Sequence, residues 1–199
     1  MKLSEDDVMF DESSDNHEKS RMSIFTSREL SMIAILSALG GAFSILLGYA
    51  GNFLTSIPLL PFGSTQFFSG LHVFWIVLAS VMVNKKGVGT LTGVLKGLVE
   101  SALVSFHGFI ALPISALEGA VLDLCLMIFG RNKTVSICLA AGFSSASNVL
   151  ILQALVLPKS FAPFLTFMYL ASFISGFTWA GLLLKRIVDL VKKHASAKV

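Results

Sequence analysis

The chain has 199 residues, of which 54% are apolar and 14% are charged, and its net charge is +3. A soluble domain usually has about a quarter charged residues, so this composition excludes an ordinary soluble domain. The apolar residues form runs of about 20 residues, each long enough for a helix to cross a hydrocarbon core about 30 Å thick. The sequence lacks the alternation of apolar and polar residues that is typical of the strands of a membrane barrel. The composition therefore predicts an all-α membrane protein.

The chain is predicted to begin with a disordered acidic tail, residues 1–22, because this segment is rich in carboxylates. Residues 23–190 form the predicted transmembrane domain, and residues 191–199 form a basic C-terminal tail. The domain contains six predicted transmembrane helices, at residues 29–50, 67–84, 87–106, 111–130, 134–156 and 164–186.

Basic residues gather on one side of these predicted spans. The loops and termini on that side contain Lys19, Arg21, Arg28, Lys85, Lys86, Arg131, Lys133, Lys185, Arg186, Lys192 and Lys193, whereas the opposite side has Lys159. Because basic loops stay in the cytoplasm, both termini are predicted to be cytoplasmic, in a multi-pass protein of the plasma membrane. The uncharged segment from Gly51 to Gln66, with Pro58 and Pro61, is then an outer loop.

Two ladders of small residues recur at four-residue spacing, which places them on one helical face and lets another backbone approach closely. They are Ala34, Ala38 and Ala42 in the first span, and Gly89, Gly93 and Gly97 in the third. We expect the glycine ladder to pack inside the domain. For the alanine ladder, internal packing and contact with another subunit are both open.

Polar side chains inside a membrane are costly, so each needs a reason. With a rise of about 1.5 Å per residue, five spans bring polar or aromatic groups to one depth in the outer half. These groups are His72, Trp75, Glu100, Glu118, Asn148 and Tyr169. A cluster at common depth below an uncharged loop predicts an outward-facing pocket. Carboxylates and aromatic faces suit a planar, partly cationic ligand.

Structural roles are the alternative for the same residues. Lys96 and Asp123 share a depth near the midplane, where we expect a structural ion pair. Lys96 and Glu100 are spaced i, i+4, so they can neutralise each other instead. His72 and Tyr169 can instead be residues of the membrane interface. Asn148 can hydrogen bond to another helix rather than to a ligand.

Motifs for catalysis or nucleotide binding are absent from the sequence. It has no GxxxxGK[ST] phosphate loop and no HExxH or GxSxG motif. Cys125 and Cys138 lie in apolar runs and indicate neither a disulfide framework nor a zinc site. We therefore predict no catalytic residue, metal site, cofactor or nucleic-acid partner. Three roles fit: a binding subunit of an importer, a stand-alone proton-coupled transporter using Glu100 or Asp123, and a membrane scaffold.

Several short motifs follow one another along the chain in an order typical of one known family. They are Ala34-x-x-x-Ala38, Gly70-Leu-His-Val-Phe-Trp75, Asn84-Lys-Lys-Gly87, Gly97-Leu-Val-Glu100, Glu118-Gly119-x-x-x-Asp123, Ser144-Ser145-x-Ser147 and Ser175-Gly176. With six predicted helices and a long first outer loop, the chain resembles the substrate-binding S components of energy-coupling factor (ECF) importers. Within that group it is most similar to the YkoE-like branch.

The resemblance implies a six-helix bundle that captures a vitamin from outside, for this branch thiamine or its hydroxymethylpyrimidine precursor. It also implies two kinds of protein partner. A transmembrane coupling protein would dock on the face formed by Ala34, Ala38 and Ala42, and cytoplasmic ATPase subunits would hydrolyse ATP. The chain itself would then be a binding protein rather than an enzyme.

Overall fold

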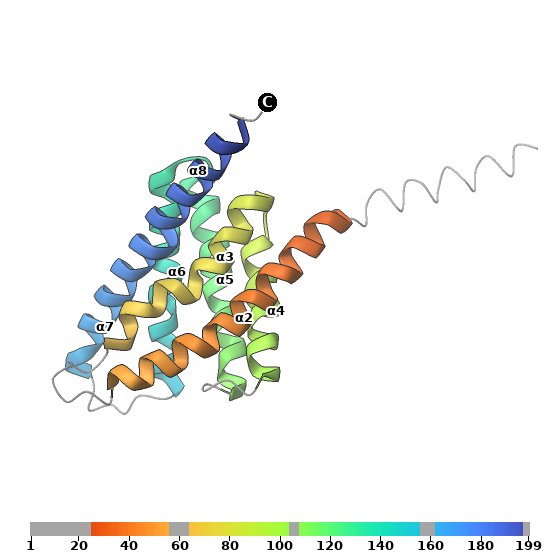
Figure 1. Ribbon diagram of the computed structural model, residues 1–199. Coiled ribbons are helices and arrows are strands. Elements are labelled where there is room, and N and C mark those ends of the chain that lie inside the picture. The colour runs from red at the N-terminus through yellow and green to blue at the C-terminus, as the bar shows by residue number, and fades with distance from the viewer. Residues whose placement is uncertain (1–24, 56–63, 104–107, 156–161, 197–199) are drawn as a thin grey trace, which may run out of the picture. The chain divides into compact units, whose positions relative to one another are not determined.

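The computed structural model describes residues 25–55, 64–103, 108–155 and 162–196. The predicted acidic tail at residues 1–22, the outer-loop residues Pro58 and Pro61, and Lys159 lie outside these ranges. Every described element is a helix. The long helices are α2 (Ser27–Thr55), α3 (Ser69–Val83), α4 (Val88–Ala102), α5 (Ala111–Phe129), α6 (Thr134–Leu155) and α7 (Ala162–Ser175). A π-helical segment, η4 (Gly176–Leu183), joins α7 to α8 (Leu184–Ser196), and 3₁₀ turns precede α3 and α5 (Figure 1).

The chain divides into two units, Met1–Met32 and Ile33–Val199. In the described part of the first unit, Thr26 and Glu29 form a capping box at the start of α2. The Thr26 amide donates to Glu29 Oε2 at 2.7 Å, and the Glu29 amide donates to Thr26 Oγ1 at 3.4 Å. These two bonds satisfy backbone donors that the first helical turn leaves free.

The predicted spans agree with the observed helices to within a few residues at most ends. Within the described ranges, five helical segments are long and apolar enough to cross a membrane: Ser27–Gly51, Gln66–Val83, Gly108–Phe129, Thr134–Ala154 and Phe164–Leu190. The segment missing from this set is α4, whose 15 residues include Lys96 and Glu100. The third predicted span, at residues 87–106, therefore stays a prediction as a membrane-crossing helix. The last helix runs on to Ser196, so much of the predicted C-terminal tail is helical.

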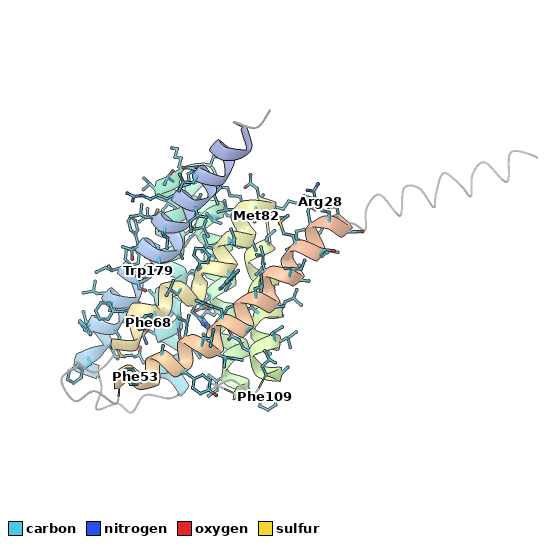
Figure 2. The ribbon with its side chains drawn as sticks, viewed as in Figure 1. Arg28, Phe53, Phe68, Met82, Phe109 and Trp179 are labelled. Atoms are coloured by element: carbon cyan, nitrogen blue, oxygen red, sulfur yellow. The ribbon has the colours of Figure 1, made fainter. Side chains whose placement is uncertain are left out.

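The core of the second unit lies between α3, α5, α6 and the η4–α8 segment. Fully or almost fully buried apolar residues from these elements contact one another, among them Ile76, Leu122, Ile137 and Leu184. Large apolar side chains also cover the outside, where Met82, Phe109 and Trp179 are exposed (Figure 2). An apolar exterior around a packed interior is what a lipid solvent favours.

The glycine ladder packs inside the domain, as predicted. A Cβ on Gly93 would overlap the carbonyl oxygen of Ser115, and a Cβ on Gly97 would lie 2.8 Å from the Leu112 Cα atom. The ladder thus lets α4 approach the backbone of α5 directly. In contrast, Ala34, Ala38 and Ala42 are all exposed, so internal packing does not explain the alanine ladder.

Candidate functional site

The centre of the candidate site is Lys96, a fully buried lysine on α4. Its ammonium group donates to His72 Nε2 at 2.9 Å, to Ser115 Oγ at 3.2 Å and to Glu100 Oε1. Ser115 in turn donates to Glu100 Oε2 at 3.4 Å. An ammonium group has three donors, so this network uses all of them and satisfies a charge that would otherwise be very costly to bury.

The orientation of the His72 ring follows from its two ring nitrogens. Nδ1 lies 2.9 Å from Ser44 Oγ, and Ser44 donates its own proton to the Gly40 carbonyl at 2.9 Å. Nε2 lies 2.9 Å from the Lys96 ammonium nitrogen on the other side of the ring. Through these contacts His72 links α2, α3 and α4.

Glu118, on α5, is fully buried, and neither of its carboxylate oxygens has a hydrogen-bond partner among the described residues. Its Oε2 lies 3.8 Å from His72 Nε2, whereas Glu100 Oε1 lies 3.7 Å from the same atom. The Glu118 main-chain carbonyl accepts from Ser144 on α6 at 2.7 Å. Buried polar atoms are nearly always paired, so an unpaired carboxylate at a network's edge needs a ligand or ordered water as its partner.

Two further residues of the predicted layer carry unpaired buried atoms, namely Trp75 Nε1 and Asn148 Oδ1. Trp75 borders the Lys96 side chain, because a Cβ built on Gly40 would meet both, at 2.9 Å and 3.3 Å. Asn148 follows Ser144 by four residues on α6, so it lies on the same helical face as the residue that contacts Glu118.

Tyr169, another residue of the predicted layer, makes its hydrogen bond outside this cluster. Its hydroxyl donates to Gln153 Oε1 at 3.0 Å, in an exposed bond between α7 and α6. An estimate of depth along a helix does not show which face of the helix a side chain occupies.

The predicted ion pair between Lys96 and Asp123 is wrong. Asp123 Oδ2 accepts from the Thr90 amide and hydroxyl at 2.8 and 2.9 Å, and its Oδ1 accepts from Arg131 Nη2 at 3.1 Å. Lys96 pairs instead with Glu100, as the i, i+4 spacing allowed. Asp123 lies beside Gly89 and Thr90 on α4, about two helical turns from Lys96, so the two residues do not share a depth.

Sequence reasoning missed Ser44 and Ser115, the two hydroxyls that complete the network around Lys96 and His72. It also missed Gly40 and Gly41, through which α2 packs on α3 and α4. A Cβ on Gly41 would lie 2.6 Å from Val99 Cγ1. A Gly-Gly pair in an apolar span signals close packing, whereas isolated serines carry no such signal.

As a whole, the cluster is a preformed polar surface inside an apolar bundle. Lys96 and Glu100 neutralise each other, and Glu118 lies beside them with His72 Nε2 at 3.8 Å and no hydrogen-bond partner among the described residues. Glu118 offers two acceptors, Trp75 offers one N–H donor, and Asn148 offers one amide oxygen. Groups of this kind are suited to a polar ligand through complementary hydrogen bonds.

The fold and this cluster define a helical membrane protein with a buried polar site. A family model for the ABC-type cobalt transport system permease component matches residues 28–148, which is more than half of the chain. The chain belongs to this family of permease components. No curated protein sequence matches the chain.

A search of solved structures gives the same picture of the fold. A crystal structure of an S-component of an ECF transporter matches with a TM-score of 0.75, covering 86% of this chain and 87% of that chain. The two sequences are 20% identical, so the match shows a common fold.

Proposed function

We propose that this protein is the membrane-embedded substrate-binding subunit, or S component, of an ECF-type ATP-dependent vitamin importer. The observation that carries the proposal is the fully buried Glu118 carboxylate, with two unpaired oxygens beside the neutralised Lys96–Glu100 pair. The S-component fold and the permease family support the same role. The Lys96 network holds the site rigid before ligand arrives, and preorganisation of this kind lowers the cost of binding.

The proposed ligand is thiamine or its hydroxymethylpyrimidine precursor. An aminopyrimidine can donate an exocyclic N–H to Glu118, and a ring nitrogen can accept from Trp75 Nε1. Thiamine also carries a positive charge, which the unpaired Glu118 carboxylate would balance. A polar ligand of this type replaces the missing partners of several buried groups at once.

Cobalt, the metal in the family's name, fits this site less well. Among the described residues, no group of three or more His, Cys, Asp or Glu side chains is placed to hold a metal ion. In addition, the Lys96 ammonium lies between His72 and Glu100, the position that a cation would take. We therefore propose an organic ligand.

The proposed partners are a transmembrane coupling protein and cytoplasmic ATPase subunits. The sequence contains no phosphate loop, so ATP hydrolysis is assigned to those subunits. The exposed face of Ala34, Ala38 and Ala42 is the proposed contact with the coupling protein. Small side chains let helices of the two proteins approach closely. In this proposal both termini are cytoplasmic and the pocket opens outward.

Thermal unfolding of the detergent-purified chain across a vitamin panel tests this proposal. A ligand at about 100 times its Kd stabilises the folded state by about 2.7 kcal/mol, which raises Tm by several degrees. We expect such a shift with thiamine or hydroxymethylpyrimidine, and we expect Glu118→Gln to abolish it. Asp189→Asn is the matched control, because its carboxylate is exposed on α8.

The remaining outcomes of the panel separate the parts of the proposal. A shift with a different vitamin would keep the binding subunit and overturn the ligand. An unchanged Tm with every vitamin would contradict the proposed function, as would a thiamine shift that survives in Glu118→Gln.

A further inference from the structure

A second polar feature lies where the turn from α3 to α4 meets the turn from α5 to α6. These turns lie at the same end of their helices (Figure 1) and enclose a cleft of about 350 Å³. Its walls include the polar residues Asn84, Lys86, Arg131 and Asn132, and the apolar residues Leu126 and Met127.

The charge around this cleft is strongly positive. The two turns carry Lys85, Lys86, Arg131 and Lys133, and the nearby carboxylate is Asp123. Asp123 is already satisfied by Arg131 and by two bonds from Thr90. Within the described parts of the chain, the ammonium groups of Lys86 and Lys133 have no hydrogen-bond or ion-pair partner. Of these two cations Lys86 lines the cleft, so the cleft has an uncompensated cation in its wall.

Arg131 is a fixed part of the cleft wall rather than a mobile surface cation. Its Nη1 donates to the Lys85 carbonyl at 2.7 Å while its Nη2 bonds Asp123 at 3.1 Å. These two bonds tie one turn to the other and hold the cleft open. An arginine with some donors still available is well suited to an oxyanion.

Two helices begin beside the cleft. The helix α4 starts at Val88 after Gly87, which has a φ of +82° and no side chain to cap the helix, and α6 starts at Thr134. Helix N-termini carry partial positive charge and unpaired N–H groups, which favour an anion. At α4 the Asp123 carboxylate already accepts from the Thr90 amide, so of the two helix starts that of α6 is available to a further anion. This adds to the cationic side chains.

The cleft also borders an apolar surface. Met127 lines it and is 57% exposed, and Leu124 and Ile128 on the same helix are 57% and 67% exposed. A free soluble anion would gain nothing from this surface. A molecule with both a charged head and an apolar chain would contact the two parts together.

We propose that this cleft binds the phosphate group of an anionic phospholipid, with one acyl chain lying along the exposed face of α5. Lys86 and Asn132 contact the phosphate at the rim, and Arg131 provides the fixed cationic wall. The site is separate from the Lys96 cluster, and the inference goes beyond the proposed transport function. Basic pockets between transmembrane helices are suited to lipid headgroups for the same electrostatic reason.

Native mass spectrometry of the full chain tests this inference. The protein is exposed to equal amounts of phosphatidylglycerol and phosphatidylcholine with identical acyl chains. We expect the wild type to retain phosphatidylglycerol several-fold better than phosphatidylcholine. Lys86→Ala should weaken phosphatidylglycerol retention about fivefold, the effect of one membrane-proximal cation. Lys86→Arg should keep it, and Arg186→Ala, at an exposed basic residue on α8, is the matched control.

Lys86 is exposed, so its replacement should leave Tm unchanged and the comparison interpretable. Equal retention of the two lipids by the wild type would overturn the inference. Equal losses in Lys86→Ala and Arg186→Ala would overturn it as well. Displacement of phosphatidylglycerol by inorganic phosphate at low millimolar concentration would assign the same phosphate chemistry to a soluble anion and exclude the lipid as the occupant.

Discussion

Replacing Lys96 with methionine removes the ammonium group and keeps a side chain of similar length. Glu100, which is 2% exposed, then loses the ammonium group with which it pairs. His72 loses a donor at Nε2, and Ser115 loses one at Oγ. Breaking a buried ion pair from one side typically costs about 3–5 kcal/mol, because the remaining charge is left uncompensated. We expect Lys96→Met to lower the free energy of unfolding by an amount in this range.

The chain contains a matched control for this prediction. Lys185 and Asp189 form another i, i+4 pair, at 2.9 Å, but their side chains are 29% and 56% exposed. Exposed pairs of this spacing contribute about 0.3–0.5 kcal/mol, so Lys185→Met should change the stability by that amount or less. Both variants are measured by denaturant titration of the purified chain in mixed micelles.

The double variant Lys96→Met/Glu100→Leu separates the buried charge from lost packing. Replacing both members of a buried pair with apolar residues is often nearly neutral, so we expect the double variant to regain most of the lost stability. If Lys96→Met cost no more than Lys185→Met, the buried network would not hold the bundle together. A double variant as unstable as the sum of the two single variants would also refute the reasoning.

Three further predictions concern the site, the packing and the proposed docking face. Trp75→Phe keeps an aromatic ring but removes the unpaired N–H. Ligand affinity, measured by calorimetry, should fall about tenfold, the value of one hydrogen bond. An unchanged Kd would show that Trp75 does not contact the ligand. Gly93→Ala would overlap the Ser115 carbonyl and should lower stability by about 3 kcal/mol, whereas wild-type stability would disprove the close approach of α4 to α5. Ala38→Leu should leave Tm unchanged, because Ala38 is exposed, but it should prevent co-purification with the coupling protein. Normal complex formation would contradict the proposal that the coupling protein docks on this face.

The sequence predicts the helices well because long apolar runs and short charged gaps leave few alternatives in a membrane. It also brings His72, Glu100 and Glu118 to one depth, and the structure places both carboxylates within 3.8 Å of the imidazole. The error on Lys96 and Asp123 is one of register between α4 and α5, because a residue count along each helix does not give the level at which two helices meet. Asp123 packs beside Gly89, whereas α5 passes Gly97 at Leu112.

An estimate of depth also leaves the rotation of each helix about its own axis unknown. Tyr169 bonds Gln153 in an exposed contact between α7 and α6, outside the Lys96 network. Ser44 and Ser115 were invisible for a related reason. A serine in an apolar span is often bonded to its own helix, and only the packed structure shows which hydroxyls reach a charged neighbour.

Reconstituted transport tests the central claim most directly. The chain is placed in proteoliposomes, alone or with a coupling protein and ATPase subunits, and uptake of radiolabelled thiamine is followed with and without ATP on the ATPase side. The account predicts that uptake requires the complete complex and ATP, and that Glu118→Gln abolishes it. Uptake by the chain alone, driven by a pH gradient and indifferent to ATP, would contradict the account and establish a proton-coupled transporter.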